Sequence, residues 1–191
     1  MSPPQGPVTG DDEKQREFEE EALVHLDALY GLALRLTGGD EPRAQDLVQD
    51  SILKAYRSWD HFETGTNCRA WLMTILRNTF INDFRRRKGR PDDVEFEDVA
   101  ERPSSSSLYE ADPEGTIFER IIDEQVIAAI EGLPEEFRVP VVLADLEGLS
   151  YQEVSELMGI PVGTVKSRLF RARKRLQETL YQYALEMGYI R

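Results

Sequence analysis

The sequence predicts an all-α protein built of two small helical domains joined by a flexible acidic linker. From residue 23 onward apolar side chains recur at the three- and four-residue spacing of helices, and no strand-like alternation is sustained. This pattern stops between residues 92 and 115, a segment rich in Asp, Glu, Ser and Pro, and helical spacing resumes after it. Two helical segments on either side of an acidic polar segment therefore indicate two domains.

Composition excludes several classes of protein. The 191-residue chain contains one cysteine, Cys68, so it cannot form an internal disulfide, and its two histidines supply no ligand cluster for a structural zinc ion. Its longest mostly apolar run, residues 139–146, is far shorter than the roughly 20 residues that a membrane span needs. Nothing near the N-terminus resembles a secretory signal. We therefore expect a cytoplasmic protein that neither enters the membrane nor uses a metal or another cofactor.

The net charge of −13 conceals two basic clusters. Residues 92–124 hold 12 acidic and 2 basic side chains, which is −10 of the total, so the flanking segments are close to neutral. The basic side chains of those segments are bunched at Arg85, Arg86, Arg87, Lys88 and Arg90, and again at Lys166, Arg168, Arg171, Arg173, Lys174 and Arg175. One such run can be no more than a solvated helix face. Two runs, each closing a helical unit, favour contacts with phosphate groups.

In the first segment a helix is predicted over residues 42–60, after a break at Gly38 and Gly39. Its buried stripe is expected to be Val48, Ile52, Ala55, Tyr56 and Trp59. Its outer face carries the acidic, amide and basic side chains of Asp46, Gln49, Asp50 and Arg57. Taken alone, such a face is most often simply solvated.

A short loop and a long helix follow. Thr66 or Asn67 is placed to cap a helix over residues 69–88. The inner stripe of this helix is predicted to be Trp71, Leu72, Ile75, Leu76, Phe80 and Phe84. The outer face is then Thr74, Arg77, Asn78, Asn82 and Arg85. Asn is costly at exposed positions inside a helix, so two of them beside arginines favour a face that binds base edges and phosphates. The loop in front, with its Gly and Asn, is suited to hold an unstacked base.

The second segment carries the signature of a helix-turn-helix. A helix over residues 136–146, which we expect to start late or bend at Pro140, is stopped by Gly148. Ser150 and Glu153 then form a capping box for a helix that ends at Gly159. Thr164 is the expected N-cap of the last helix, whose inner residues are Val165, Leu169, Ala172 and Leu176.

The second helix of such a unit inserts its N-terminal half into the major groove of DNA. The side chains expected on its outer face are Lys166, Ser167, Phe170, Arg171 and Lys174. Arg binds guanine through two hydrogen bonds, Ser binds a base or a phosphate, and Thr164 with the first N–H groups of the helix can hold a phosphate. The alternative is a helical hairpin with a basic surface and no ligand, against which the capping box, the turn glycine and the density of basic side chains all argue.

Three stretches of the chain resemble bacterial sigma factors of the extracytoplasmic-function group of the sigma-70 family. They are AQDLVQDSILKAYRSWDHF (44–62), RAWLMTILRNTFINDFRRRK (69–88) and LSYQEVSELMGIPVGTVKSRLFRARKRL (149–176). The third is the most specific, because it combines the turn chemistry with the DNA-reading residues. The resemblance implies four parts, namely a disordered acidic tail (1–15), sigma region 2 (16–91), an acidic Ser/Pro linker (92–115) and sigma region 4 with its helix-turn-helix (116–191).

The resemblance also implies that the chain itself catalyses no reaction. The chain would be a transcription initiation factor rather than an enzyme, and would bind the β and β′ subunits of core RNA polymerase and direct them to stress-responsive promoters. Contacts with core polymerase fall on Asp46, Gln49 and Asp50. Contacts with the melted minus-ten element fall on Gly65, Thr66, Asn67, Arg77, Asn78, Asn82, Arg85, Arg86, Arg87 and Lys88. Contacts with the minus-35 duplex fall on Thr164, Lys166, Ser167, Arg168, Phe170, Arg171, Arg173 and Lys174. A flipped base would lie near Asn78.

A finer resemblance concerns regulation. The stretch ETGTNCRAWLMTILRNTFIN and the tail ending YALEMGYIR are similar to the thiol-oxidative-stress subgroup of actinobacteria. That subgroup implies an anti-sigma factor that contains zinc and releases its partner when its own cysteines oxidise, although other anti-sigma classes stay open. The redox sensor would then be the partner, with Cys68 expected to be a half-buried structural thiol and its direct oxidation as the alternative. We expect a monomer when the chain is free.

Two other functions compete with this interpretation. A stand-alone helix-turn-helix regulator would shift duplex DNA unaided, but it needs a dimerisation element, which we do not find, and leaves the outer Asn pair unexplained. An enzyme would need a His partner, metal-ligand spacing or a phosphate-binding glycine loop, and none is present in the sequence. The acidic linker is expected to keep the protein soluble, or alternatively to repel DNA from the free chain.

Overall fold

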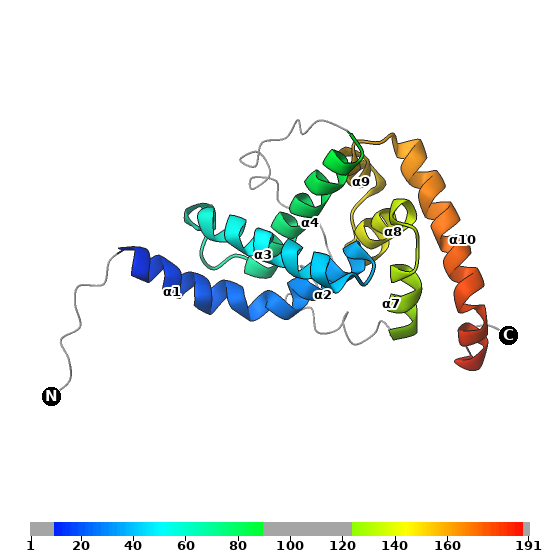
Figure 1. The fold of residues 1–191 in the computed structure, drawn as a ribbon, viewed down its shortest axis with the longest axis horizontal. Coiled ribbons are helices and arrows are strands. Elements are labelled where there is room, and N and C mark those ends of the chain that lie inside the picture. Colours follow the sequence, from blue (N-terminus) through cyan, green and yellow to red (C-terminus); the bar gives the residue numbers. More distant parts are fainter. Residues whose placement is uncertain (1–9, 90–123, 189–191) are drawn as a thin grey trace.

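The computed structural model describes residues 10–89 and 124–188, and the regular structure in both ranges is helical, which confirms the all-α prediction. We call the first range the N-terminal domain and the second the C-terminal domain. The N-terminal domain consists of α1 (Gly10–Ala22), α2 (Leu26–Thr37), α3 (Glu41–Arg57) and α4 (Cys68–Arg87), with short 3-10 turns at Leu23–His25 and Trp59–His61. The C-terminal domain consists of α7 (Glu124–Glu131), α8 (Glu135–Val141), a π-helical turn (Val142–Leu146), α9 (Tyr151–Met158) and α10 (Val162–Glu186). The two domains lie side by side, with α10 on the side of the C-terminal domain that faces away from α3 (Figure 1). The predicted linker lies outside the described residues.

Part of the predicted disordered tail is helical. Because α1 already includes residues 10–15, the prediction of disorder was wrong for that stretch, while residues 1–9 lie outside the described residues. The ammonium group of Lys14 lies 2.8 Å from the Asp60 carboxylate, and the ring of Phe18 is buried. An ion pair and a buried aromatic ring thus hold this helix against the rest of the domain, which composition alone did not indicate.

The helix α3 begins at a capped position and exposes the face that the sequence predicts. The Asp40 carboxylate accepts a hydrogen bond from the Arg43 backbone N–H at 3.2 Å. The buried side chains of α3 are Ala44, Leu47, Ser51 and Ala55. The predicted stripe residues Val48, Ile52 and Tyr56 are only half-buried, so the inward face is rotated slightly from the predicted one.

The helix α4 is capped as predicted but is buried on more than one side. The Asn67 side chain accepts a hydrogen bond from the Ala70 N–H at 2.9 Å, which confirms the cap. The predicted inner residues Leu72, Ile75, Leu76, Phe80 and Phe84 are buried, and Trp71 is half-buried. Met73, Arg77, Asn78 and Ile81 are buried as well. The prediction that only one stripe of α4 is buried was therefore wrong. The helix packs against α2 and α3 on one side and against α9 of the C-terminal domain on another.

The helix-turn-helix has the local structure that the sequence predicts, except at the start of its last helix. Pro140 lies inside α8, and the chain widens into the π-helical turn directly after it, as expected for a residue that lacks an N–H and crowds the preceding turn. The capping box is confirmed by two hydrogen bonds, from the Glu153 N–H to Ser150 Oγ at 3.2 Å and from the Ser150 N–H to Glu153 Oε2 at 2.7 Å. Gly159 ends α9 in the left-handed conformation, with φ of 61°.

The predicted start of the last helix was wrong by one turn. The helix α10 begins at Val162, with Pro161 at the N-cap, so Thr164 lies inside the first turn and its side chain caps nothing. The Pro161 carbonyl accepts the N–H groups of Thr164 at 2.8 Å and Val165 at 3.1 Å, which starts the helix without a side-chain cap. Pro161 has a φ of −59°, the value that the proline ring imposes and that a helix start needs.

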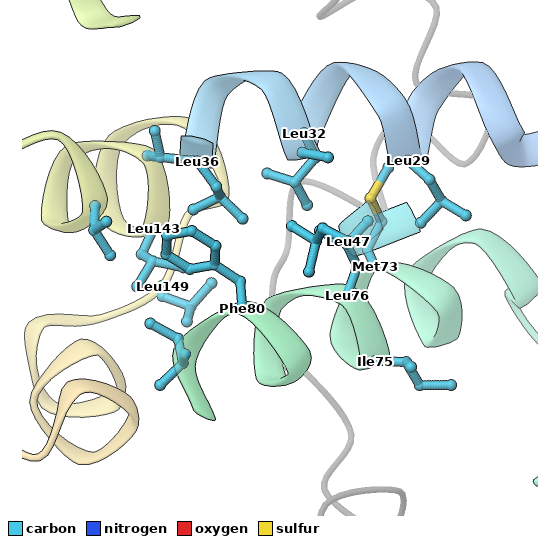
Figure 2. Packing of buried hydrophobic residues seen from close by; sticks show 14 of the residues in the cluster. Leu29, Leu32, Leu36, Leu47, Met73, Ile75, Leu76, Phe80, Leu143 and Leu149 are labelled. Atoms are coloured by element: carbon cyan, nitrogen blue, oxygen red, sulfur yellow. The ribbon is translucent and has the colours of Figure 1, made fainter. Parts of the chain in front are cut away.

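The two domains share one hydrophobic core. Phe80 of α4 lies between Leu36 of α2 and two residues of the C-terminal domain, Leu143 and Leu149, and all four side chains are buried (Figure 2). Burial of apolar surface is the main favourable term in domain association.

Within the described ranges no helix is both long and apolar enough to cross a membrane.

Candidate nucleic-acid interface

The N-terminal half of α10 presents a polar and basic face to solvent. Val165, Leu169 and Ala172 are buried, as predicted, and α10 packs on α7, α8 and α9. The side chains predicted to be exposed are so, namely Lys166, Ser167, Phe170, Arg171 and Lys174, and Arg173 and Arg175 are exposed as well. Phe170 is 71% exposed, which is unusual for a large apolar side chain and suits contact with a thymine methyl group. This face has the chemistry of a recognition helix.

Two other residues predicted to contact DNA, Arg168 and Arg173, pair with acidic side chains of their own domain. Arg173 donates hydrogen bonds to both carboxylate oxygens of Asp145, at 2.6 and 3.1 Å, and a third to the hydroxyl of Tyr151. These bonds raise the pKa of Arg173 above its ordinary value. Arg168 is half-buried, and its guanidinium lies 3.8 Å from Glu136. Both arginines help to fix α10 on its own domain, and Arg173 stays exposed while it does so.

On α4 the predicted outer face is divided. Arg77 is only 3% exposed and Asn78 only 7%, so the expectation that both lie on an open surface was wrong. Arg77 faces Glu147 of the C-terminal domain at 3.8 Å. The amide nitrogen of Asn78 has no hydrogen-bond partner in the part of the chain that the structure describes. Thr74, Asn82 and Arg85 are half-buried. Periodicity alone could not reveal this burial, because residues far away in the sequence contribute to it.

The basic end of α4 is also occupied in part by the C-terminal domain. Arg85 donates a hydrogen bond of 2.6 Å to the backbone carbonyl of Glu156. Arg87 donates to both carboxylate oxygens of Glu135, at 3.0 and 3.3 Å. Arg86 pairs with Asp83 on its own helix, and Lys88 is exposed. Of the four cations predicted to hold a DNA backbone, two thus bind oxygen atoms of the other domain.

The loop before α4 stays open. Gly65, Thr66 and Asn67 are exposed, and Gly65 adopts a φ of 89°, which few residues with a side chain tolerate. A Cβ atom at Gly65 would meet nothing within 4 Å. Glycine is therefore favoured at this position by the backbone conformation and not by a lack of space. The Thr66 hydroxyl donates to the Glu63 carbonyl at 2.7 Å and tightens the loop.

The outer face of α3 contains a residue that sequence reasoning missed. Asp46, Gln49 and Asp50 are exposed, as predicted. Leu53, three residues beyond Asp50, is 55% exposed on the same face. The exposure of Leu53 could have been predicted from the sequence. Leu53 follows Gln49 by four residues and Asp50 by three, so in a helix it lies on their outer face and not on the buried one.

Comparison with known proteins matches both domains to one family. A model of Sigma-70 region 2 matches residues 23–90, and a model of Sigma-70 region 4 matches residues 123–176. The chain is 35% identical over 179 residues to the ECF RNA polymerase sigma factor SigE of Mycolicibacterium smegmatis, covering 94% of this chain and 67% of the relative. It is 35% identical over 164 residues to the ECF RNA polymerase sigma factor EcfG of Rhodopseudomonas palustris, covering 86% and 85%.

A solved structure agrees with these matches. The sigma factor RpoE of Bartonella quintana, in complex with the anti-sigma factor NepR, is 33% identical, with a TM-score of 0.51 over 87% of this chain and 98% of the other. The chain belongs to the extracytoplasmic-function sigma factors of the sigma-70 family. Its N-terminal domain contains region 2 and its C-terminal domain contains region 4, and we use these names below. Sigma factors are transcription initiation factors, so this sigma factor directs core RNA polymerase to promoters.

Cys68, at the start of α4 in region 2, is poorly suited to sense oxidants. Its side chain is buried, and burial, followed by the nearby charge of Glu21, raises the pKa of its thiol to about 12. The thiolate is the reactive form, so this group is protonated at neutral pH and nearly inert. Among the described residues no three His, Cys, Asp or Glu side chains are grouped to hold a metal ion.

Proposed function

We propose that this sigma factor reads the minus-35 duplex with α10 and the melted minus-ten element with α4 and the loop before it, at stress-responsive promoters. The observation that carries the proposal is the recognition face of α10, where Lys166, Ser167, Phe170, Arg171 and Lys174 stand exposed above a buried stripe. The chain thus has two separate DNA-binding elements, a recognition helix in one domain and a run of four consecutive cations, residues 85–88, at the C-terminal end of α4 in the other.

On α10 some side chains are suited to contact base edges and others to contact phosphates. Arg171 suits two hydrogen bonds to one guanine, and Ser167 suits a base or a phosphate. Lys166 and Lys174 suit phosphate oxygens, which strengthen binding without adding sequence information. Thr164 lies half-buried in the first turn, where the free N–H groups of the helix favour a phosphate.

On α4 the buried amide of Asn78 supports a role in holding a flipped base. Its nitrogen lacks a hydrogen-bond partner within the described residues, and an unmade hydrogen bond of this kind costs about 1–3 kcal/mol. A base edge would satisfy it. Asn82, together with Arg85, Arg86, Arg87 and Lys88, would hold the backbone of the melted strand.

Core polymerase is proposed to dock on α3 of region 2. Asp46, Gln49 and Asp50 form an exposed polar strip, and Leu53 adds an apolar contact beside it. A small apolar anchor within a polar rim is typical of protein interfaces. We propose that the protein acts in the cytoplasm and as a monomer when free.

We further propose that an anti-sigma factor controls this chain. The support is its likeness to RpoE, which was solved with the anti-sigma factor NepR. Within the anti-sigma factors we propose the zinc-containing class, on the resemblance of residues 63–82 to the thiol-oxidative-stress subgroup. The inert state of Cys68 agrees with a sensor in the partner rather than in this chain. Release of the chain from its co-purified partner by a mild oxidant and by a zinc chelator would support this class, and release by neither would point to another.

Transcription in a purified system tests the function. The wild-type chain is added to sigma-free bacterial core polymerase with a pool of promoter fragments, beside an Asn78→Ala, Arg171→Ala double variant. Arg16→Ala, which removes an exposed arginine on α1, is the matched control. Transcripts with defined starts are expected from the wild type and the control but not from the double variant. If core polymerase neither binds the chain nor initiates with it, a stand-alone duplex-binding regulator becomes the better account.

A further inference from the structure

Arg173 on α10 is held by three hydrogen bonds although about half of its side chain is open to solvent. Its Nε donates to one Asp145 oxygen at 3.1 Å, and its Nη2 donates to the other at 2.6 Å and to the Tyr151 hydroxyl at 3.1 Å. The Arg173 side chain is still 49% exposed. An exposed ion pair contributes little to stability, because holding two side chains in one geometry costs entropy. Stability alone is therefore a weak reason for a guanidinium that is held at three points.

The two residues that hold Arg173 are themselves fixed by the local structure of region 4. Asp145 lies in the π-helical turn that follows Pro140, and irregular turns of this kind are frequent at functional sites. Tyr151 is the first residue of α9 and comes directly after the capped position at Ser150. Both acceptors thus have defined positions to which Arg173 is bound. We call Asp145, Tyr151 and Arg173 the arginine clamp.

The arginine clamp leaves one nitrogen of the guanidinium available for a further partner. A guanidinium carries five N–H groups. Asp145 and Tyr151 accept three of them, from Nε and Nη2, and the two on Nη1 have no partner among the described residues. A bidentate contact with guanine needs parallel N–H groups on two neighbouring nitrogens. Arg173 in the clamp is therefore suited to bind a phosphate oxygen through Nη1, and not to read a base.

The place of Arg173 on α10 also favours a phosphate. Arg173 follows Phe170 by three residues and Lys166 by seven, so it lies beside them at the edge of the recognition face. A recognition helix contacts bases with its N-terminal half. Arg173 lies about three turns beyond Val162, the first residue of α10, and so falls toward the sugar–phosphate backbone. Tyr151 begins the first helix of the unit, which is the helix that crosses the backbone.

We propose that Asp145 and Tyr151 are positioning residues for DNA binding, which hold Arg173 so that its Nη1 group binds one phosphate of the minus-35 duplex. This inference rests on the proposed function of α10. Immobilising a long side chain when a complex forms weakens binding by about threefold to tenfold. A side chain that is already fixed in the free protein avoids this loss. Asp145 by itself would repel a phosphate, so it favours DNA binding only through Arg173.

The arginine clamp is first tested in the free chain by the nuclear magnetic resonance signals of arginine Nε–H groups. The signal that is lost in Arg173→Ala belongs to Arg173. We expect this signal to shift in Asp145→Asn, because the bond from Nε to a charged oxygen is lost, and to stay in place in Glu178→Gln. Glu178 is the matched control, since it is a carboxylate of α10 that pairs with Lys174 at 4.0 Å, outside the clamp. Circular dichroism checks that every variant is folded.

A double-mutant cycle then tests whether Asp145 acts on DNA binding through Arg173. The probe is a promoter duplex that gives transcripts with the parent chain, and its binding to the complete polymerase complex is measured. Asp145→Asn is expected to weaken binding about threefold in the parent chain. In the Arg173→Ala background the same change is expected to leave binding equal or up to about twofold tighter, since only the loss of a negative charge remains. Glu178→Gln is expected to have the same effect in both backgrounds.

Salt and sequence dependence identify the kind of contact that Arg173 makes. Arg173→Ala is expected to weaken binding about tenfold, the effect of losing a hydrogen bond between charged groups. It is also expected to reduce the slope of log affinity against log salt by about one and to leave the preference at each base pair unchanged. Tyr151→Phe, which removes one acceptor and no charge, is expected to weaken binding about twofold. A loosened α10 would instead displace Arg171 as well and reduce base preference.

Three results would overturn the inference. An Arg173 signal that is the same in the parent chain and in Asp145→Asn would show that no clamp forms in solution. Equal effects of Asp145→Asn in both backgrounds would show that Asp145 does not act through Arg173. Loss of base preference in Arg173→Ala would show that Arg173 reads a base or merely supports α10.

These results are distinct from a failure of the proposed function. If the parent chain does not initiate with core polymerase on any fragment, the proposed function is refuted and this inference with it. Initiation by the parent chain without coupling between Asp145 and Arg173 refutes the inference alone.

Discussion

The two helices that we propose to contact DNA, α4 and α10, differ in how they pack against the rest of the molecule. On α10 the exposed positions are the ones that its own periodicity predicts, and Arg171 and Lys174 face solvent. On α4 the polar positions Arg77 and Asn78 are buried, although the same reasoning placed them outside. The difference is that α10 packs within one domain, whereas α4 also lies at the contact between two. A helix at such a contact has two inward faces, and a single hydrophobic stripe describes only one of them.

Phe80→Ala has the largest expected effect, because Phe80 lies in the core shared by both regions. Truncation of a buried Phe costs about 3–5 kcal/mol of unfolding free energy. If the regions form one cooperative unit, chemical denaturation of this variant gives a single transition at a lower midpoint. Val165→Ala, a truncation inside region 4 only, is the comparison. Two separate transitions in the parent chain would show that the regions unfold independently and that α4 is not a shared helix.

Arg171→Ala has the next largest expected effect, on promoter binding rather than on stability. Loss of a bidentate contact with guanine costs about 1–3 kcal/mol of discrimination at that base. Binding of promoter duplexes by the complete polymerase complex is expected to weaken and to lose preference at one base pair of the minus-35 element. Lys174→Ala is expected to weaken binding to all sequences equally and to reduce its salt dependence. Equal loss of sequence preference in both variants would contradict the division of roles on α10.

Ser150→Ala and Thr164→Ala separate a real helix cap from a wrongly predicted one. The Ser150 hydroxyl accepts the Glu153 N–H, so its removal is expected to lower the unfolding free energy of the protein by about 1 kcal/mol. Thr164 caps nothing, and its removal is expected to change stability by less than about 0.5 kcal/mol. Thermal denaturation of the two variants measures the difference. An equal loss in both would mean that Thr164 stabilises the start of α10 after all.

Local chemistry explains which features could be predicted from the sequence. The capping box at Ser150 and the cap at Asn67 involve residues three positions apart, so the chain carries their full description. The start of α10 was missed because Pro161 supplied a helix start that competes with Thr164. The burial of Arg77 could not be predicted, since its partner Glu147 lies seventy positions away. The contact between the domains could not be predicted, because local spacing in the sequence does not show which distant residues pair.

Acidification is expected to have the smallest effect, and it bears directly on that contact. Burial raises the pKa of Glu135, but hydrogen bonds from Arg87 and the charges of Arg87, Arg43 and Arg138 outweigh it, so the pKa lies below the ordinary value. A carboxyl whose pKa is lowered in the folded protein stabilises the fold above its ordinary pKa of about 4.3, and this contribution is lost as the pH falls through the lowered value. The facing groups are arginines, which stay charged throughout. The contribution of Glu135 to the equilibrium constant for folding, measured by chemical denaturation of the parent chain and of Glu135→Gln, should therefore fall about twofold to fivefold on acidification from about pH 6 to pH 3.5. Glu135→Gln should flatten this dependence and Glu178→Gln should preserve it, and an unchanged slope in Glu135→Gln would assign the acid sensitivity to other carboxylates.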